Sequence, residues 1–241
     1  MLLYLIRHGE SESNRADPRL REAAPWRCPE LTDWGREQAQ AAGLKLQAAG
    51  IERLYSSPLL RALQTAAILE PMFKCPVEIR AELSETFFGS RAPLLNKEIA
   101  RRFPTFRLKR LRCTATGDWF TAFRAKNWQD IHTHTAVMAR ELRSLANKFK
   151  AVAAVIHGGN GSDLLDRLLG APPADYVRFE FANCSISLLE IENGRLLVKY
   201  LNQPTVQAAS KPDIEGSAAE TGLRGRKRNA RRVSCAASHM R

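Results

Sequence analysis

The sequence predicts an α/β fold, a three-layer sandwich in which helices cover both faces of a mostly parallel central sheet. Three observations support this prediction. Short apolar segments with strand character alternate along the chain with segments of helical periodicity. Residues 151–156 (AVAAVI) are apolar at every position, as in a strand that is buried on both faces. The chain has 241 residues and is 44% hydrophobic, which is enough for one substantial core.

The first strand is expected over residues 2–6, and it stops at Arg7-His8-Gly9-Glu10. In open α/β sheets, ligands bind just beyond the carboxyl ends of the strands. A fixed cation, an imidazole and a glycine therefore stand where a ligand would bind. Taken alone, this triplet fits equally well a loop with a solvated arginine and a surface histidine. The recurrence of a buried strand followed by His157-Gly158 favours a binding site.

The first helix is expected over residues 36–47, a stretch rich in alanine and glutamine that ends near Gly50. Thr32 or Asp33 could cap its amino end. The preceding residues 17–29 contain three prolines and several charges, and they are expected to be irregular.

A second short strand is expected over residues 51–55, followed by a helix over residues 58–72. Ser57 is a typical N-cap residue and Pro58 a typical first helical residue. Arg61 then lies in the first turn, where a cation faces the positive end of the helix dipole, an arrangement that is normally unfavourable. An anion bound at the same helix start would make this position of the arginine favourable. An arginine whose side chain extends to solvent is the alternative.

Glu85 follows a third short strand, expected over residues 76–79, and it precedes Phe87 and Phe88. An apolar setting makes a carboxyl group a usable proton donor. An exposed loop carboxylate is the alternative at this position.

Residues 90–135 mix basic clusters with aromatic side chains. This composition fits either a nucleic-acid surface or a partly helical lid over a phosphate site, and the lid is favoured. In His132-Thr133-His134, alternate spacing would place the two rings on opposite faces of a strand. No carboxylate or cysteine spacing completes a site there, so no metal is expected.

The carboxyl-terminal half continues the alternation of helices and strands. The elements expected there are a helix over 135–150, the strand 151–156, a helix from the His157-Gly158 turn to Leu169, and a hairpin of 182–191 and 196–201 joined at Asn193-Gly194.

Two strands of one parallel sheet can bring His8 and His157 to the same crevice, with Arg7 and Arg61 nearby. Arginine forks bind phosphate oxygens bidentately and stay charged. An imidazole is largely neutral and nucleophilic at pH 7. A carboxyl group such as that of Glu85 could protonate a departing alkoxide and then accept a proton from the attacking water. The combination suits phosphoryl transfer without a metal or cofactor.

Five motifs, in the correct order over residues 2–202, closely resemble the histidine phosphatase superfamily, the phosphoglycerate mutase-like family. The motifs are Arg7-His8-Gly9-Glu10-Ser11 with Asn14, Leu31-Thr32 with Gly35 and Gln38-Ala39, Ser56-Ser57-Pro58 with Arg61-Ala62 and Thr65-Ala66, Leu83-Ser84-Glu85 with Gly89, and His157-Gly158. The resemblance implies the phosphoglycerate mutase-like fold.

The resemblance also implies a role for each matched residue. It implies that His8 is the nucleophile that forms a phosphohistidine, and that Glu85 is the proton donor. The catalytic set that it implies is His8, Glu85 and His157, and the phosphate-binding set is Arg7, Asn14, Arg61 and Gly158.

Departures from the family pattern favour a phosphatase that hydrolyses phosphomonoesters over a mutase. Many members carry Trp-Glu-Gly or a similar run after the equivalent of Gly89, where this chain has Ser90-Arg91-Ala92-Pro93. Gly159 stands where the mutases carry asparagine. A mutase-type phosphotransferase and a non-catalytic binding protein on the same fold are the alternatives.

The net charge of +12 divides into +5 for residues 209–241 and +7 for the rest of the chain. The excess of positive charge outside residues 209–241 favours a small phosphorylated substrate. We expect a catalytic domain over residues 1–207, with 90–135 as a lid. Residues 208–241 have almost no large apolar side chains and are expected to be a disordered tail. A solvated basic tail is favoured over one that contacts RNA or an acidic surface.

Five cysteines are scattered without CxxC spacing, which favours reduced thiols and a cytoplasmic location over a disulfide framework or a zinc site. No apolar run approaches the roughly 20 residues needed to span a bilayer, so no membrane contact is expected.

Overall fold

A computed structural model describes residues 1–14, 29–85, 94, 96–108 and 127–206. All of these residues fall within the compact unit Met1–Ser210. Several predictions lie outside the described residues, namely the irregular segment up to residue 28, the phenylalanines that follow Glu85, much of the lid and the basic tail. The boundary between the catalytic domain and the tail stays a prediction.

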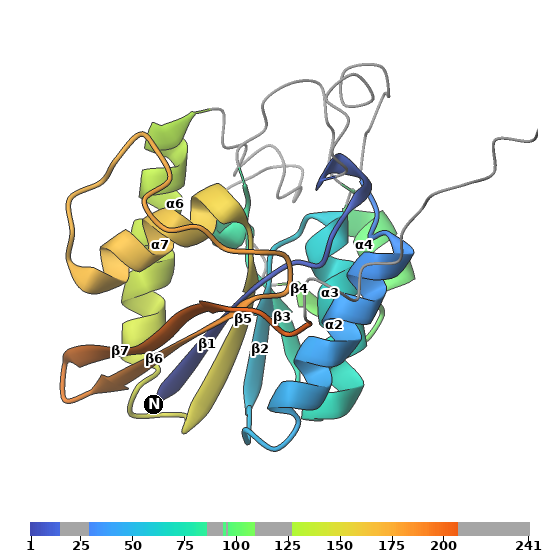
Figure 1. Ribbon diagram of the computed structural model, residues 1–241, viewed down its shortest axis with the longest axis horizontal. Helices are drawn as coiled ribbons and strands as arrows, with labels where there is room; N and C mark the ends of the chain where they lie inside the picture. Colours follow the sequence, from blue (N-terminus) through green and yellow to red (C-terminus); the bar gives the residue numbers. More distant parts are fainter. Residues whose placement is uncertain (15–28, 86–93, 95, 109–126, 207–241) are drawn as a thin grey trace, which may run out of the picture. The chain divides into compact units, whose positions relative to one another are not determined.

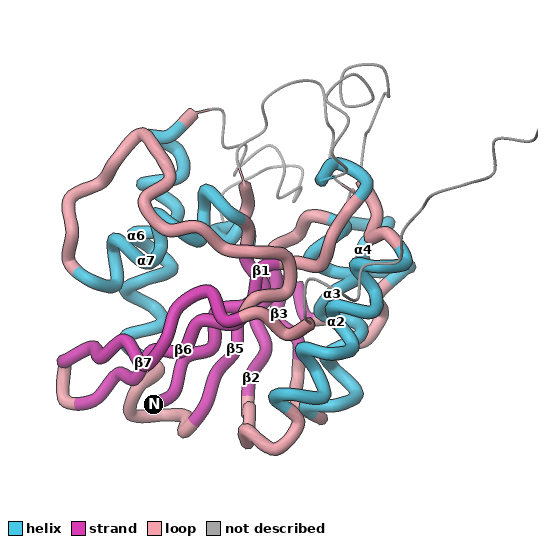
Figure 2. Tube along the Cα trace, in the orientation of Figure 1, coloured by secondary structure: helices cyan, strands magenta, loops and turns pink. Residues whose placement is uncertain are grey.

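The described residues form one seven-stranded sheet in the order β4-β3-β2-β5-β1-β6-β7 (Figures 1 and 2). The strands are β1 (Leu2–Arg7), β2 (Arg53–Ser56), β3 (Val77–Ile79), β4 (Arg107–Leu108), β5 (Ala151–Ile156), β6 (Ile186–Glu192) and β7 (Arg195–Gln203). The first five strands of this order are parallel, and β6 and β7 add an antiparallel hairpin at one edge. The predicted mostly parallel sheet and its terminal hairpin are confirmed.

Helices cover both faces of the sheet (Figure 1). They are α2 (Asp33–Leu46), α3 (Leu60–Phe73) and α4 (Asn96–Arg102) on one side, and α6 (Trp128–Ser144) and α7 (Gly158–Leu169) on the other, with short 3-10 turns η1 (Glu12–Asn14) and η2 (Ala81–Leu83). No helix in the described part of the chain combines the length and the apolar character that a membrane span requires.

The central strand β5 separates two hydrophobic cores. Ala153 and Val155 belong to the core under α2 and α3. Val152 and Ile156 belong to the core under α6 and α7. Because successive side chains of a strand point to opposite faces, a run that is apolar at every position can fill both cores. The prediction that residues 151–156 are buried on both faces is confirmed.

The predicted start of α3 is wrong. Ser57 does not cap the helix and Pro58 is not its first residue, because the helix begins at Leu60 with Leu59 as the N-cap. The Ser57 N–H donates to the carbonyl of Val155 at 3.2 Å, so Ser57 prolongs the pairing of the sheet. The prediction of Arg61 in the first turn survives this shift.

The predicted strand at His132-Thr133-His134 is also wrong, because both histidines lie on α6, which begins at Trp128 rather than at residue 135. Asn127 caps this helix, with its Oδ1 accepting the N–H of Asp130 at 3.0 Å. β-Branched residues lower helix propensity here, but the burial of Ile131 stabilises the helix.

A buried charge cluster ties the segment after β3 to α6. Arg80 is 1% exposed, and its guanidinium donates to Glu82 (Nε to Oε2, 3.2 Å) and to Glu141 of α6 (Nη2 to Oε2, 2.6 Å). Burial lowers the pKa of Arg80, but the hydrogen bonds to Glu141 and Glu82 outweigh burial and raise the pKa overall. The cluster fixes the short stretch that leads to Glu85.

Candidate active site

Two histidines meet at the carboxyl ends of adjacent parallel strands. Arg7 at the end of β1 pairs in register with Ile156 at the end of β5. His8 and His157 are the next residues of these strands, and their ring centroids are 5.0 Å apart with the planes tilted by 54°. The His8 N–H donates to the carbonyl of Ile156 at 3.0 Å, which holds the two strand ends together.

Hydrogen bonds define which nitrogen of the His8 ring carries the proton. Its Nδ1 lies 2.7 Å from the carbonyl oxygen of Gly9, and the Nε of Arg61 donates to its Nε2 at 3.1 Å. Because a carbonyl only accepts, Nδ1 carries the proton and Nε2 holds the lone pair. Burial, then Arg61 and Arg7, hold the pKa of His8 well below its ordinary value, against the opposing bond to Gly9. The ring is therefore neutral at pH 7, with its lone pair on Nε2.

The loop after His8 is packed tightly against the start of α2. The Gly9 N–H donates to Thr65 Oγ1 of α3 at 3.1 Å. A Cβ atom on Gly9 would lie 2.3 Å from the carbonyl oxygen of Gly35, and a Cβ atom on Gly35 would lie 1.9 Å from that of Glu10. Thr32 caps α2 by accepting the Gly35 N–H at 3.0 Å, which confirms one of the two predicted caps. The position of His8 thus depends on two glycines.

His157 is the N-cap residue of α7 and is 1% exposed. Its Nε2 lies 2.7 Å from the hydroxyl oxygen of Ser57. Its Nδ1 is buried and has no hydrogen-bond partner among the described residues. Burial lowers the pKa of His157 well below the usual value, and Arg61, His8 and Arg7 lower it further. The second imidazole is therefore also neutral at pH 7.

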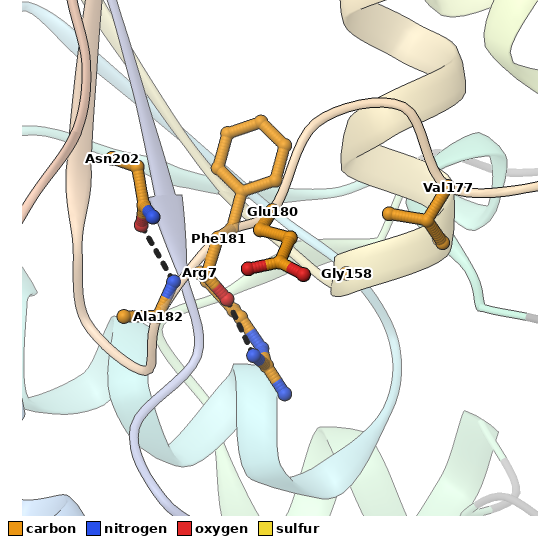
Figure 3. Close-up of a pocket in the computed structure, with 8 residues that line it drawn as sticks. Arg7, Gly158, Val177, Glu180, Phe181, Ala182 and Asn202 are labelled. Carbon is orange, nitrogen blue, oxygen red and sulfur yellow. Dashed lines mark hydrogen bonds between the residues drawn. The ribbon is translucent and has the colours of Figure 1, made fainter.

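Two arginines border the histidine pair. Arg61 reaches His8 from the first turn of α3. The Nη1 of Arg7 donates to the carbonyl of Phe181 at 2.5 Å, and its Nε is buried with no partner within the described part of the chain (Figure 3). Burial lowers the pKa of Arg7, while Glu85 and Cys184 act in the opposite direction. Both guanidiniums lie close enough to the two rings to influence their pKa values, and they could bind an anion beside the histidine pair.

Glu85 lies at the amino end of α7. Its Oε2 accepts the N–H of Gly159 at 2.9 Å and that of Asn160 at 3.4 Å. A Cβ atom on Gly159 would lie 2.9 Å from Oε1, so the glycine makes room for the carboxylate. Asn160, fully buried, also donates through Nδ2 to the carbonyl of Glu82 at 3.3 Å. This arrangement places a carboxylate next to His157 and Gly158.

Asn14 is joined to His8 through a second amide. Its Oδ1 accepts from the N–H of Ser11 at 3.1 Å and from the Nδ2 of Asn183 at 3.3 Å. The same Nδ2 donates to the carbonyl of His8 at 3.0 Å. With Oδ1 occupied, the amide nitrogen of Asn14 is the group suited to donate to a phosphate oxygen.

The structure therefore brings together every residue that the resemblance assigns to the site, and it adds three that the sequence did not indicate. Ser57 orients His157, Asn160 holds the Glu85 segment, and Asn183 links His8 to Asn14. Ser57 belongs to a matched motif, but its sequence position predicts only a helix cap. Nothing in the local sequence around Asn183 indicates its role.

The hydrogen-bond partners of His132 do not belong to this set of residues. The His132 ring lies between two carboxylates, with Nδ1 2.7 Å from Asp163 and Nε2 3.0 Å from Asp175. Across the residues that the structure describes, no group of three or more histidine, cysteine or acidic side chains is arranged to hold a metal ion.

Comparison with known proteins agrees with this geometry. The sequence model of the histidine phosphatase superfamily (branch 1) matches residues 3–204. The 2,3-bisphosphoglycerate-dependent phosphoglycerate mutase of Bartonella tribocorum is 29% identical over 69% of this chain and 86% of that protein. The adenosylcobalamin/alpha-ribazole phosphatase of Salmonella typhimurium is 29% identical over 86% of this chain and 98% of that protein. This chain spans about half the length of three further phosphoglycerate mutases that it matches.

A solved structure shows the same fold. The alpha-ribazole phosphatase from Shigella flexneri aligns with a TM-score of 0.62 at 23% identity, over 84% of this chain and 96% of that one. The predicted three-layer α/β architecture is thereby confirmed.

Proposed function

Since the chain belongs to the histidine phosphatase superfamily (branch 1), we propose that it is a phosphatase that hydrolyses phosphomonoesters through a phosphohistidine on His8, without a metal. The observation that best supports this proposal is the state of the His8 ring. It is neutral, its proton is fixed on Nδ1 by Gly9, and its Nε2 faces the guanidinium of Arg61.

In the first step, the lone pair on His8 Nε2 attacks the phosphorus atom and the bond from phosphorus to the ester oxygen breaks. Arg61, which donates to Nε2 at 3.1 Å, transfers its hydrogen bond to a phosphate oxygen as the ester binds. Arg7 and Asn14 donate to the other oxygens. These fixed donors stabilise the charge on the transferring group.

His157 acts as a neutral donor in this proposal. Ser57 Oγ accepts the N–H of Leu59 at 3.3 Å, so its own hydrogen can be donated to His157 Nε2. The proton of the neutral ring then lies on Nδ1, which is buried and has no partner in the described part of the chain. A phosphate oxygen would supply that partner, together with the N–H of Gly158 at the start of α7.

Glu85 handles the protons in both steps. As a carboxylic acid it donates its proton to the departing alkoxide, and as a carboxylate it then accepts a proton from the attacking water. The water oxygen bonds to phosphorus, the bond from phosphorus to Nε2 breaks, and inorganic phosphate leaves. His8 returns to its neutral form with the lone pair on Nε2.

A mutase is the second candidate, because a phosphoglycerate mutase is among the relatives of similar identity. The phosphatase relative covers more of this chain, 86% against 69%, which favours hydrolysis. The two candidates differ in product, since a mutase returns the phosphoryl group to a second hydroxyl and releases an isomer instead of inorganic phosphate.

The proposal is tested by hydrolysis of p-nitrophenyl phosphate in the presence of EDTA. Wild-type protein should release p-nitrophenolate, and His8→Asn should lower kcat by at least about 1000-fold, because the nucleophile is lost. His239→Asn, in the tail, is the matched control and should keep full activity. Activity that requires an added divalent metal, or that survives in His8→Asn, would contradict the proposal. A catalytically silent binding protein would show no hydrolysis by any of the three proteins.

We also propose a cytoplasmic location, supported by the cysteines. Cys75 and Cys184 are buried free thiols, and none of the five cysteines has CxxC spacing. Thiol titration of the denatured protein without reductant should find all five cysteines reduced. A lower count would contradict this location.

A further inference from the structure

A pocket of about 400 Å³ adjoins the candidate phosphate site. Arg7 and Gly158, two residues of that site, form part of its lining (Figure 3). Gly159 of α7, the segment before β6 and the end of β7 form the rest, the last two through residues such as Val177, Glu180 and Asn202. Pockets that bind small molecules have volumes of roughly 300–1,000 Å³, so the space suits the part of an ester that lies beyond its phosphate.

Hydrogen bonds hold the far wall of the pocket in one arrangement. The Arg7 guanidinium binds the carbonyl of Phe181 at 2.5 Å, and the N–H of Ala182 donates to Asn202 Oδ1 at 2.6 Å. Asn202 has a φ of 52°, a left-handed conformation that asparagine tolerates better than most residues. Its own N–H donates to Ser187 Oγ at 2.9 Å. The wall is therefore tied both to the phosphate site and to the sheet.

Glu180 gives this pocket its chemical character. Its carboxylate points toward the Gly158 end of α7 in Figure 3, and it makes no hydrogen bond or ion pair with the residues that the structure describes. An ionised carboxylate only accepts hydrogen bonds. It would stabilise hydroxyl or ammonium groups of a bound molecule and would repel a second anionic group.

We propose that this pocket receives the alcohol part of the substrate, and that Glu180 selects phosphomonoesters whose alcohol carries hydroxyl or ammonium donors and no second anion. The inference rests on the proposed phosphatase function, because the pocket opens from the site where Arg7 would bind the phosphate. Polyol phosphates and amino-alcohol phosphates both belong to this substrate class.

Four esters test this selectivity: glycerol 3-phosphate as a polyol, phosphoethanolamine as an amine, 3-phosphoglycerate as an anion, and p-nitrophenyl phosphate as the reference. The wild type should have a higher kcat/KM for the polyol or the amine than for 3-phosphoglycerate. Glu180→Gln should reduce that preference by at least about tenfold, the effect expected from losing a hydrogen bond to a charged group. Glu190→Gln is the matched control and should leave the preference unchanged, because Glu190 is a partly exposed carboxylate on β6 that pairs with Lys199.

The outcomes separate the two claims. If no ester is hydrolysed, the proposed function fails. If p-nitrophenyl phosphate is hydrolysed but wild type and Glu180→Gln show the same preference, the role of Glu180 fails and the phosphatase stands. A larger loss in the variant for phosphoethanolamine than for glycerol 3-phosphate identifies the amine as the favoured donor, and the reverse identifies the polyol.

A second variant tests the pocket independently of its charge. Val177 is 46% exposed, so Val177→Trp is compatible with folding and would reduce the volume of the pocket. It should lower kcat/KM for esters of large alcohols more than for methyl phosphate. An equal effect on large and small esters would overturn the placement of the alcohol in this pocket.

Discussion

At the scale of single residues, the tautomer and the protonation state of His8 follow from the groups that surround its ring. The backbone carbonyl of Gly9 selects the tautomer, since it can only accept a proton from Nδ1. Burial and two guanidiniums keep the ring neutral. The guanidiniums that would bind a phosphate in the proposed mechanism therefore also keep the His8 ring unprotonated.

This environment makes stability depend on pH. The pKa values of His8 and His157 lie well below the ordinary value of about 6.5 in the folded chain and return to it on unfolding. Below pH 6.5 the unfolded chain therefore binds protons that the folded chain does not. The free energy of unfolding should fall as the pH is lowered, by up to about 1.4 kcal/mol per pH unit for each histidine.

Urea unfolding at pH 7.5, 6.5 and 5.5 measures this effect. His157→Asn should flatten the decline in the free energy of unfolding, because one of the two buried histidines is gone. His239→Asn should leave the slope of the wild type unchanged. An identical slope in His157→Asn and the wild type would show that His157 is not held neutral in the folded state.

At the scale of elements, the position of His8 depends on how closely its loop approaches α2. The carbonyl of Glu10 lies where a Cβ atom of residue 35 would be, and backbone atoms cannot move aside as a flexible side chain can. Gly35→Ala should therefore lower the free energy of unfolding by about 1–3 kcal/mol, the usual range for overpacking. It should also reduce kcat, because the loop that carries His8 must shift.

Thermal denaturation and p-nitrophenyl phosphate hydrolysis together check this prediction. Gly158→Ala is the control for stability, because its Cβ atom would meet no atom within 4 Å, and it should leave Tm unchanged. A Gly35→Ala protein with the Tm and kcat of the wild type would contradict the proposed dependence of the site on this contact.

Elements with a clear local pattern were predictable from the sequence. The run 151–156 is apolar at every position and short enough to favour a doubly buried strand, and Thr32 before a helical stretch is a strong cap signal. The starts of α3 and α6 were not predictable in this way. Ser57 continues the sheet because of a partner 98 residues away, Val155, and α6 extends back to Trp128 despite β-branched residues.

At the scale of the whole molecule, the site exists because β1 and β5 are neighbours although they are far apart in the chain. Local sequence patterns predict that each histidine lies at the end of a strand. Only the order of the strands in the sheet brings those two ends together. The matched motifs implied this convergence through resemblance. Contacts between distant segments, such as those of Asn183 with His8 and Asn14, carry no signal in the sequence and required the structure.

A covalent phosphoryl group on His8 is the central intermediate of the proposed mechanism, and trapping it tests the mechanism most directly. In the proposed mechanism, Glu85→Gln removes the group that activates water, whereas p-nitrophenolate leaves without needing a proton. This variant should therefore release one equivalent of p-nitrophenolate in a burst and keep one phosphoryl group per chain. Peptide mapping after a quench in base should place that group on His8, with loss on treatment with acid. Steady turnover without a burst, or a phosphoryl group on any other residue, would contradict the account.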